Sequence, residues 1–349
     1  MRPYSATARR RLTDREGARI MAKMPEQTMV VEYDRTGDTD VLELRSKPLP
    51  AAEPGQVTVE VICAGISHID GFIREGRESE WIDDPWPRRS GSDFAGVVVS
   101  GDRASKFPPG SEVIGHVRSG AHSTYVTVPV GALVAKPKGV TWETAGGLYL
   151  AGATALDTLD ELKIGPSDTV VISAAAGGVG SVEAQLAKHR GAKVIGTCGD
   201  RNFDYLRQLG IKPVRYGDGI VERIRDAAGG PVTALIDNFG QDGHAIAAEL
   251  GVPESRYRSS ADRRHTELRL LRDDPESIAY GTQLLERLAQ LAQARAFTLL
   301  ISGLYPLEEI SDAYLDLQKL HSRGKVLIGT HMVTTFRTLK ARDVHEAAG

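Results

Sequence analysis

A glycine-rich turn carries the most specific chemistry in this chain. An apolar run at 170–173 enters Ala174-Ala175-Ala176-Gly177-Gly178-Val179-Gly180, and a helix-like stretch follows at 182–190. A strand, a glycine turn and a helix bring backbone N–H groups close to a pyrophosphate, whose charge is favoured at the helix N-terminus. The strict GxGxxG pattern is broken at Ala175, but a second strand-like run at 192–197 completes a βαβ unit. The sequence therefore predicts a dinucleotide site that includes Ala176, Gly177, Gly178, Val179 and Gly180.

The end of the second strand bears on the choice of cofactor. An acid there binds the ribose 2′-OH of NAD and would repel a 2′-phosphate. This chain instead has Gly196-Thr197-Cys198-Gly199, followed by Asp200 and Arg201. Small neutral residues with a guanidinium just beyond them favour NADPH. The alternative is that Asp200 caps a helix and Arg201 is simply solvated.

Composition narrows the class of protein. The 349 residues suit two domains of ordinary size, and 41% hydrophobic with 26% charged residues is typical of a soluble globular protein. A net charge of -3 gives no general attraction to nucleic acid, and no apolar run reaches the length of a membrane span. The two cysteines, Cys63 and Cys198, suit a reducing compartment. We therefore expect a cytoplasmic protein that acts on a small molecule, with neither nucleic acid nor membrane as partner.

The pattern of apolar residues changes along the chain and divides it into two regions. From Met29 to about Val134, short apolar alternations are broken by Gly and Pro, which predicts a small barrel-like β domain. From about Gly152, strands and helices alternate, and this predicts a parallel, doubly wound sheet. The expected strands of the second region are 169–173, 193–197, 233–236 and 297–301. Apolar residues spaced by three or four from Leu307 to Leu320 predict a late helix, and 325–328 a final strand. Residues 1–28 are expected to be a disordered extension, and 331–349 a tail without an assigned function.

Several short motifs, in unbroken order over about 29–330, carry a family resemblance. They include Pro54-Gly55-Gln56-Val57, Gly91-Ser92-Asp93-Phe94-Ala95-Gly96, Leu150-Ala151-Gly152-Ala153-Thr154-Ala155 and Arg323-Gly324-Lys325-Val326. In these motifs the chain resembles the medium-chain dehydrogenase/reductase superfamily, and within it the zinc-free quinone oxidoreductase branch. The resemblance implies an α/β fold with a GroES-like β-barrel catalytic domain at 29–151 and 302–330. It also implies a Rossmann domain at 152–301, an active site in the cleft between the two domains, and contacts from Arg201 and Tyr216 to the cofactor phosphate.

The places where the zinc-dependent branch has its ligands hold other residues here. They are occupied by Ser67, by Ser92 with Asp93, and by Leu150. Zinc needs cysteine, histidine or carboxylate ligands in a tetrahedral set, so we expect no metal. The alternative is a metal bound by His68, His116 and His122, although single histidines are more often surface or hydrogen-bonded residues.

The residues expected near the substrate, which we call the reacting end, depart from the quinone reductase pattern, in which Asn-x-x-Asp is followed by a tyrosine. Here Ser67 replaces the asparagine, and Phe72 replaces the tyrosine. The candidate hydrogen-bond donors are Ser67, His68, Tyr149 and Thr154, and we expect the proton donor to be His68 or Tyr149. The alternatives are a hydrogen-bonded core histidine and a packed tyrosine ring. Arginines that could bind a substrate anion, but that more often form solvated faces, are Arg74, Arg88 and Arg89.

These residues favour hydride chemistry without a metal. Reduction at the β-carbon of an enone or quinone sends negative charge to an oxygen that one hydrogen-bond donor can hold. We therefore predict an NADPH-dependent reductase of quinones or α,β-unsaturated carbonyls. The alternatives are a biosynthetic carbonyl reductase or cyclase using the same cleft, and a nucleotide-binding accessory protein that has lost turnover. A homodimer is expected to pair through the strand edge near 256–260.

Overall fold

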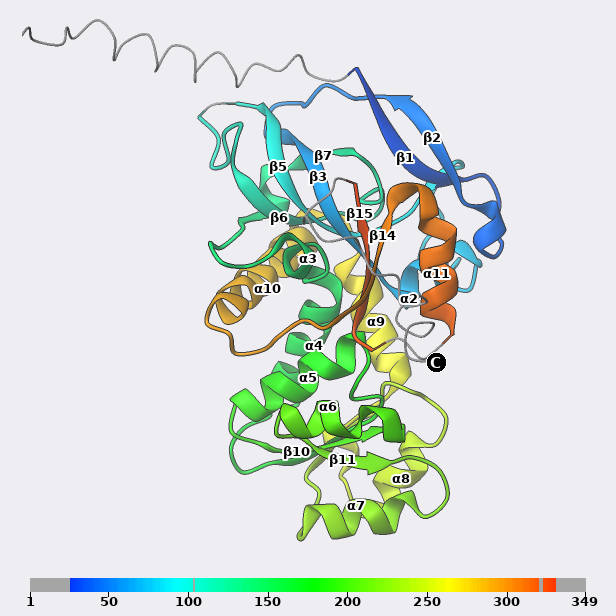
Figure 1. The fold of residues 1–349 in the computed structure, drawn as a ribbon, viewed down its shortest axis with the longest axis vertical. Coiled ribbons are helices and arrows are strands. Elements are labelled where there is room, and N and C mark those ends of the chain that lie inside the picture. Colours follow the sequence, from blue (N-terminus) through cyan, green and yellow to red (C-terminus); the bar gives the residue numbers. More distant parts are fainter. Residues whose placement is uncertain (1–25, 103, 320–322, 331–349) are drawn as a thin grey trace, which may run out of the picture.

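The computed structural model describes residues 26–102, 104–319 and 323–330, and within them it contains three β-sheets. Figure 1 shows two of these sheets in the upper half of the molecule, while the third lies in the lower half among helices. The predicted extension at 1–28 falls almost wholly outside the described residues, and the predicted tail at 331–349 falls wholly outside them. No helix in the described part of the chain has both the length and the apolar character needed to cross a membrane.

The upper half is built from short strands. A small sheet has the order β2-β1-β4, and a larger one has the order β14-β15-β3-β5-β6-β8, with β7 paired to β3. The strands of the small sheet are β1 (Gln27–Tyr33), β2 (Glu43–Pro48) and β4 (Arg88–Arg89). Those of the larger sheet are β3 (Gln56–Ile66), β5 (Asp93–Gly101), β6 (Glu112–His116), β7 (Tyr125–Pro129), β8 (Leu133–Ala135), β14 (Ile301–Pro306) and β15 (Lys325–Gly329). Alternate side chains of β3, among them Val57, Val59 and Val61, are fully buried and form the centre of this half.

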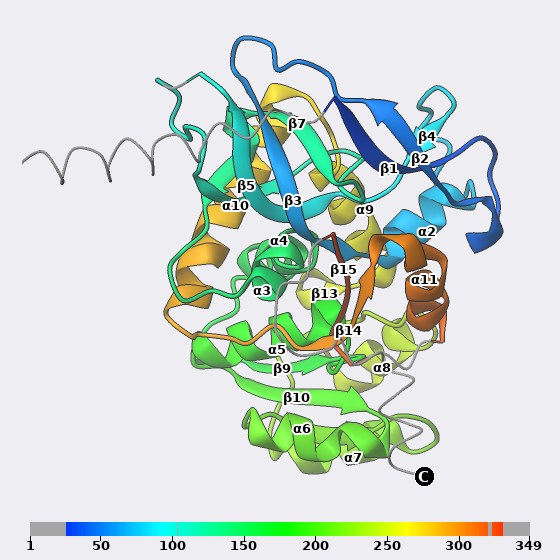
Figure 2. The same cartoon turned by 45° about the horizontal axis from the view of Figure 1, so that its top comes forward.

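The lower half is a parallel sheet of five strands in the order β11-β10-β9-β12-β13, which is the doubly wound order 3-2-1-4-5. Its strands are β9 (Thr169–Ile172), β10 (Lys193–Cys198), β11 (Lys212–Arg215), β12 (Ala234–Ile236) and β13 (Tyr257–Arg258). Helices follow these strands, as Figures 1 and 2 show: α5 (Gly178–His189), α6 (Phe203–Gln208), α7 (Ile220–Ala228), α8 (Gly243–Leu250) and α9 (Ser260–Leu270). The predicted fold class, a GroES-like half joined to a Rossmann-type sheet, is confirmed.

Further helices cover and connect the sheets. They are α2 (His68–Arg74), α3 (Trp142–Gly146), α4 (Tyr149–Glu161), α10 (Pro275–Gln293) and α11 (Ile310–Gln318). The predicted late helix is α11, which packs on β14 and β15, and the predicted final strand is β15. The domain boundaries at 151/152 and 301/302 remain predictions, although β14 and β15 do pair with the upper sheet.

The prediction of a strand at 297–301 is wrong for residues 297–300. Residues 297–300 are not in a strand, and β14 begins only at Ile301 and pairs with β15 of the upper sheet. Phe297 and Leu299 are buried, which explains the strand-like alternation in the sequence. The backbone of Thr298 is instead satisfied by a side chain, because its N–H donates to Gln185 Oε1 at 2.9 Å and its carbonyl accepts from Gln185 Nε2 at 3.0 Å.

The two halves meet at the glycine turn. Gly324, just before β15, forms an isolated parallel bridge with Gly177, and its N–H donates to the Ala176 carbonyl at 3.0 Å. Gly324 has φ +85°, and a Cβ there would lie 2.1 Å from the Leu300 carbonyl oxygen, so only glycine fits. The turn that the sequence assigns to the cofactor is therefore fixed against the last strand of the upper half.

Candidate active site

The glycine turn is built for close approach. Gly180 could not carry a side chain, because a Cβ would lie 2.5 Å from the Ala174 carbonyl oxygen. Ala174 itself has φ 47°, a strained backbone conformation of the kind that concentrates at functional sites. The alanine at the place of the first glycine is accommodated by Gly196 on β10, where a Cβ would lie 2.6 Å from the Ala175 Cβ. The broken GxGxxG pattern is thus compensated on the neighbouring strand.

The turn lies between two cavities and offers unpaired N–H groups to one of them. In an α-helix the first N–H groups have no acceptor within the helix, and in α5 these belong to Gly178, Val179 and Gly180. All three residues line a cavity of about 390 Å³, while Ala176 and Gly177 line a second cavity of about 580 Å³ on the other side of the turn. Since unpaired N–H groups at a helix N-terminus bind phosphate, this cradle fits the pyrophosphate of a dinucleotide.

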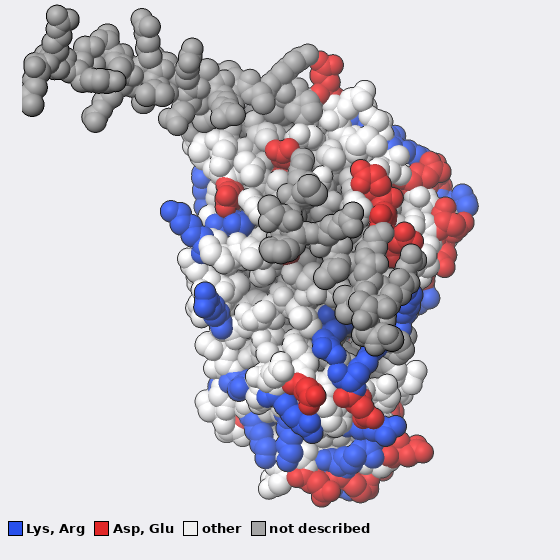
Figure 3. Space-filling view, in the orientation of Figure 1, with Lys and Arg blue, Asp and Glu red and all other residues white. Residues whose placement is uncertain are grey.

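At the end of the larger cavity that is lined by Arg201 and Tyr216, arginine side chains lie near the acid Asp200. Arg201 and Tyr216 both line it, and the Tyr216 hydroxyl would lie 3.5 Å from a Cβ at Gly199. The exposed Asp200, which weighed against NADPH, is paired with Arg215 at 3.6 Å. In Figure 3, lysine and arginine side chains are frequent on the lower half of the visible face, the half that contains the five-stranded sheet.

Arg323 joins the same end from outside the five-stranded sheet. Its guanidinium donates to the Asn202 Oδ1 and to the Arg201 carbonyl, both at 2.8 Å, and it lies 5.6 Å from the Tyr205 ring centroid. Sequence reasoning missed this residue, because nothing in a position just before the last strand indicates that it reaches the cofactor end.

The smaller cavity, which we call the cleft, brings Ser67 and His68 to the glycine turn. Lys325 lines it too, and its ammonium donates to the Ser67 Oγ at 2.8 Å and to the Ile66 carbonyl at 2.7 Å. The lysine is only 4% exposed, and a Cβ at Gly178 would lie 3.3 Å from its Cδ. Lys325 thus passes between the glycine turn and Ser67, which were predicted to hold the cofactor and the substrate.

Two buried carboxyl groups lie near this ammonium. Asp70 and Asp93 are largely or fully buried, and burial raises the pKa of both; the pKa of Asp70 rises to about 7. The charge of Lys325 acts in the opposite direction on both carboxyls. Asp70 Oδ2 accepts the Ser67 N–H at 2.8 Å, so the acid and the lysine hold Ser67 from two sides.

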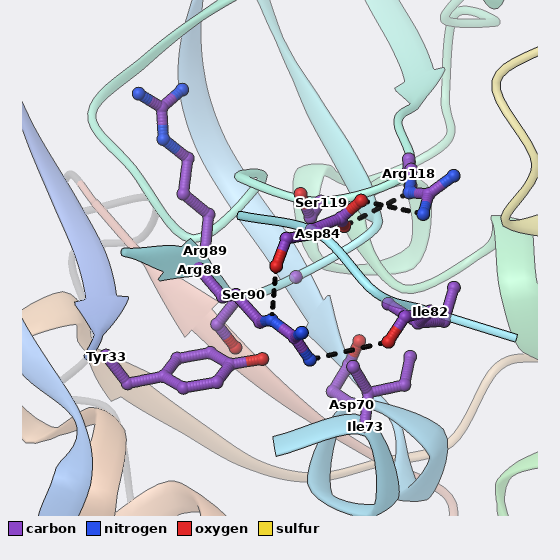
Figure 4. Close-up of a pocket in the computed structure, with 11 residues that line it drawn as sticks. Tyr33, Asp70, Ile73, Ile82, Asp84, Arg88, Arg89, Ser90, Arg118 and Ser119 are labelled. Atoms are coloured by element: carbon purple, nitrogen blue, oxygen red, sulfur yellow. Dashed lines mark hydrogen bonds and ion pairs between the residues drawn. The ribbon is translucent and has the colours of Figure 1, made fainter. Parts of the chain in front are cut away.

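Helix α2 separates the cleft from a much smaller cavity. His68 and Phe72, four residues apart, face the cleft, with their rings stacked 6.5 Å apart. Asp70 and Ile73 line the other side, a cavity of about 20 Å³ that has room for about one water molecule. Figure 4 shows the Tyr33 ring extending toward this space beside Asp70.

The surroundings of His68 favour its neutral form. Burial, and then the charges of Arg263 and Lys325, lower its pKa to about 4. A neutral imidazole offers an N–H as a hydrogen-bond donor, but it holds no spare proton at pH 7. The prediction that His68 is a general acid is therefore not supported by this environment, although its place in the cleft is the predicted one.

Tyr149 and Thr154 do not line the cleft. The Tyr149 hydroxyl donates to the Leu270 carbonyl at 2.8 Å, its ring stacks on His116 at 4.1 Å, and burial raises its pKa. It is a packed ring, which was the alternative interpretation of this residue. Thr154 is fully buried, and its Oγ1 has no hydrogen-bond partner in the described structure.

The three histidines considered as metal ligands do not converge. His116 Nε2 hydrogen-bonds Thr282, and His122 bonds both Ser90 and the Gly65 carbonyl at 3.0 Å. No group of three or more His, Cys, Asp or Glu residues suited to a metal occurs in the described residues.

The arginines considered as anion readers lie outside the cleft, and of the three only Arg89 is exposed. Arg74 and Arg88 are 1% and 7% exposed and lie over the rings of Tyr314 and Trp86. Arg88 and Arg89 line the small cavity of Figure 4, not the cleft.

Two further groups were missed. Asn238, just after β12, lines the cleft with an Oδ1 that has no partner in the described structure, and its Nδ2 donates to Glu183 at 2.6 Å. Arg263 on α9 also lines the cleft. In the sequence it stands in Asp262-Arg263-Arg264-His265, which is indistinguishable from a solvated helix face.

Comparison with known proteins agrees with this arrangement. Residues 53–138 match the alcohol dehydrogenase GroES-like domain, and residues 214–328 match a zinc-binding dehydrogenase domain. The chain is 27% identical to a probable mitochondrial zinc-binding oxidoreductase of Arthroderma benhamiae, over 88% of this chain and 98% of that protein. It is 26% identical to an NADPH-dependent alkenal/one oxidoreductase of Arabidopsis thaliana, over 88% and 81%.

A solved structure extends the likeness to the fold. The quinone oxidoreductase of Coxiella burnetii superposes with a TM-score of 0.74 at 26% identity, over 87% of this chain and all of that one. The two domains and the cleft are those of an oxidoreductase. The chain belongs to the medium-chain dehydrogenase/reductase superfamily, and its relatives include quinone oxidoreductases and enoyl reductases.

Proposed function

We propose that this protein is an NADPH-dependent reductase of α,β-unsaturated carbonyls or quinones that works without a metal. The observation that carries the proposal is the cleft itself, in which Ser67, held by Lys325, stands beside the N–H groups of the glycine turn. NADPH, when bound, supplies the hydride. The protein must then orient the substrate and hold the charge that develops on its oxygen.

Ser67 is the donor best placed to hold that charge. Its Oγ accepts a hydrogen bond from the Lys325 ammonium, so its own hydrogen remains available to a substrate oxygen in the cleft. Hydride addition at the β-carbon would shift the C=C π pair to the bond between the α-carbon and the carbonyl carbon, and the C=O π pair to the oxygen. The Ser67 O–H and the nearby ammonium would then stabilise the enolate. A proton from water completes the reduction at the α-carbon. We assign Ser67 as a catalytic residue and Lys325 as the residue that positions and polarises it.

The preference for NADPH is supported by the arginines at the far end of the larger cavity. Arg201 and Tyr216 line it, Arg323 is anchored beside it, and the only acid at the strand end is paired with Arg215. The Arabidopsis relative is described as NADPH-dependent. A 2′-phosphate would enter a positive environment, whereas the acid nearest to the strand end, Asp200, is paired with Arg215.

The proposal that no zinc takes part is supported by the residues at the ligand places. Ser67 is hydrogen-bonded to the Lys325 ammonium, and a Zn²⁺ ion at this place would be repelled by that positive charge. Leu150 is a buried apolar side chain and has no atom that can ligate zinc. Elemental analysis of the purified protein should find less than stoichiometric zinc, and a chelator should leave turnover intact. One zinc per chain, with activity lost on chelation, would place the protein with the zinc-dependent relatives.

The function is tested by following nicotinamide absorbance with a panel of enones, quinones, aldehydes and saturated ketones. We expect oxidation of NADPH with enones or quinones and little with saturated ketones, because a carbonyl alone lacks the conjugated β-carbon. Turnover confined to aldehydes or ketones would favour the carbonyl reductase alternative. Tight NADPH binding without turnover on any substrate would favour the accessory-protein alternative.

A twofold dimer through the sheet edge remains part of the proposal. Strand β13 is the outer strand of the five-stranded sheet, where the sequence predicted the pairing edge. Light scattering at micromolar protein should return twice the chain mass, and a monomer would exclude this assembly.

A further inference from the structure

One guanidinium in the cleft has no partner. Arg263 lies in the first turns of α9 and lines the cleft together with Ser67 and His68. Its Nε is buried and makes no hydrogen bond, and the side chain forms no ion pair within the described residues. Its charge acts on two groups near the cleft: it adds to the lowering of the pKa of His68 by burial, and it opposes the rise that burial causes in the pKa of Glu183.

The neighbouring arginines are already satisfied. Arg264 pairs at 3.3 Å with Glu78, which is buried, and its guanidinium lies 4.8 Å from the Phe72 ring centroid. Arg77 lies 4.9 Å from the same centroid and pairs at 2.8 Å with Glu75. Both arginines line the cleft, but Arg264 is paired with Glu78, whereas Arg263 makes no side-chain hydrogen bond or ion pair within the described residues.

A buried N–H without an acceptor, such as that of the Arg263 Nε, is costly, and the half-exposed side chain lies where a ligand in the cleft can accept hydrogen bonds from it. A carboxylate is the matching group, because it accepts two parallel N–H bonds from one guanidinium. Glu267, one turn further along α9, is buried in the same wall of the cleft. Because Arg263 and Glu267 lie one turn apart on this wall, a singly charged anion suits this wall better than a dianion such as a phosphate monoester.

We propose that the substrate of this cleft carries a carboxylate that binds Arg263, so that the enzyme reduces unsaturated carbonyl compounds which are themselves acids. This inference rests on the proposed reductase function and narrows its substrate class. The carboxylate would lie on the α9 wall, and the conjugated carbonyl would lie toward Ser67. The recognition is thus separate from the chemistry, because Arg263 binds a part of the substrate that does not react.

The test compares an acid with its ester. β-Acetylacrylate and its methyl ester both present an enone, and only the acid carries a charged carboxylate; because esterification also changes the reactivity of the double bond, each variant is compared with wild type by its acid-to-ester ratio. Wild-type protein should favour the acid in kcat/KM, and Arg263→Met should lower the acid-to-ester ratio about 10- to 100-fold, the size of a charge-assisted hydrogen bond. Arg263→Lys should retain part of the preference. The matched control, Arg272→Met, removes an exposed arginine just beyond α9 that pairs with Asp274, and it should keep the wild-type ratio.

A binding measurement separates this inference from the reductase proposal. Levulinate and methyl levulinate, the saturated counterparts, are titrated against the protein with NADP⁺ present. Wild type should bind levulinate more tightly than its ester, and Arg263→Met should remove the difference without weakening NADP⁺. If no substrate is turned over, the reductase proposal fails, and the levulinate titration still decides the role of Arg263. An unchanged acid-to-ester ratio, no levulinate binding by wild type, or a loss of NADP⁺ affinity in Arg263→Met would each overturn the inference.

Discussion

The two cavities that meet at the glycine turn are built on different physical principles. The larger one is lined by backbone, apolar side chains, the buried Asp237 and exposed groups such as Arg201 and Tyr216, so the groups suited to a phosphate are ones that water also reaches. The cleft instead contains the buried Lys325, with the buried Asp70 close to Ser67. The cofactor end therefore binds through shape and accessible charge, whereas the reacting end depends on ionisable groups held away from water. Substitutions at the two ends should consequently differ in size and in kind.

The largest effect is expected at Lys325. Lys325→Met removes the donor that holds the Ser67 Oγ and leaves the nearby buried carboxyls without their cation. We expect kcat to fall about 100-fold or more, in the range seen on loss of one oxyanion-hole donor, with a smaller change in KM. Steady-state kinetics with NADPH and an enone would measure this. The exposed Lys319, paired with Asp316, supplies the control Lys319→Met.

A double variant sharpens the assignment. If Lys325 acts through Ser67, then adding Ser67→Ala to Lys325→Met should cost little more than either change alone, because the two residues form one unit. Independent, multiplying losses would show that the ammonium acts on the substrate by itself. NADPH titration of each variant shows that the fold and the cofactor end are intact.

A smaller effect is expected at the cofactor end. Arg201→Ala should weaken NADPH about 10- to 100-fold, as for loss of a charged hydrogen bond, and leave NADH nearly unchanged. Fluorescence titration with both cofactors would measure it. Arg207, an exposed arginine of α6 that pairs with Asp204, provides the control Arg207→Ala. Equal losses for NADPH and NADH would show that Arg201 does not bind the 2′-phosphate.

The contrast between the two ends also explains what the sequence could and could not predict. The glycine turn was predictable because local spacing dictates it, and even its exception, Ala175, is compensated by Gly196 on the adjacent strand. The reacting end depends on residues far apart in the chain, since Lys325 meets Ser67 across 258 positions. No local pattern announces such a contact. Its only trace in the sequence is a lone lysine that opens an apolar strand.

For the residues that had two possible interpretations in the sequence, tertiary contacts determine which interpretation holds. Both His68 and Tyr149 were candidates for the cleft, with ring packing the favoured interpretation for Tyr149; α4 turns the tyrosine toward Leu270, while α2 points the histidine into the cavity. The missing strand at 297–300 has the same origin, because the Gln185 side chain replaces a neighbouring strand as partner of Thr298. Composition and periodicity do not encode these choices.

The buried acid of the reacting end predicts a pH dependence of stability. The pKa of Asp70 is raised to about 7 in the folded protein from an unfolded value of 3.8. The unfolded chain therefore loses this proton at lower pH than the folded protein, and the free energy of unfolding falls as pH rises from about 4 to about 7. Glu183, with a pKa raised to about 7, contributes with the same sign. The melting temperature of the wild-type protein should fall between pH 5 and pH 8, and in Asp70→Asn this fall should be smaller by a few degrees. If the two proteins show the same pH dependence, the pKa of Asp70 is not raised.

The smallest effect is expected at Tyr149, the residue for which sequence and structure disagree most. Its hydroxyl is 2.8 Å from the Leu270 carbonyl, it is fully buried, and it does not line the cleft. Tyr149→Phe should therefore keep kcat within about twofold of wild type. It should lower stability by about 1 kcal/mol, the net worth of one buried hydrogen bond. Turnover and thermal melting of the same preparation measure both quantities. A tenfold loss of kcat at unchanged stability would mean that the cleft extends to Tyr149 during turnover, and the division between a packed core and a reacting end would have to be redrawn at α4.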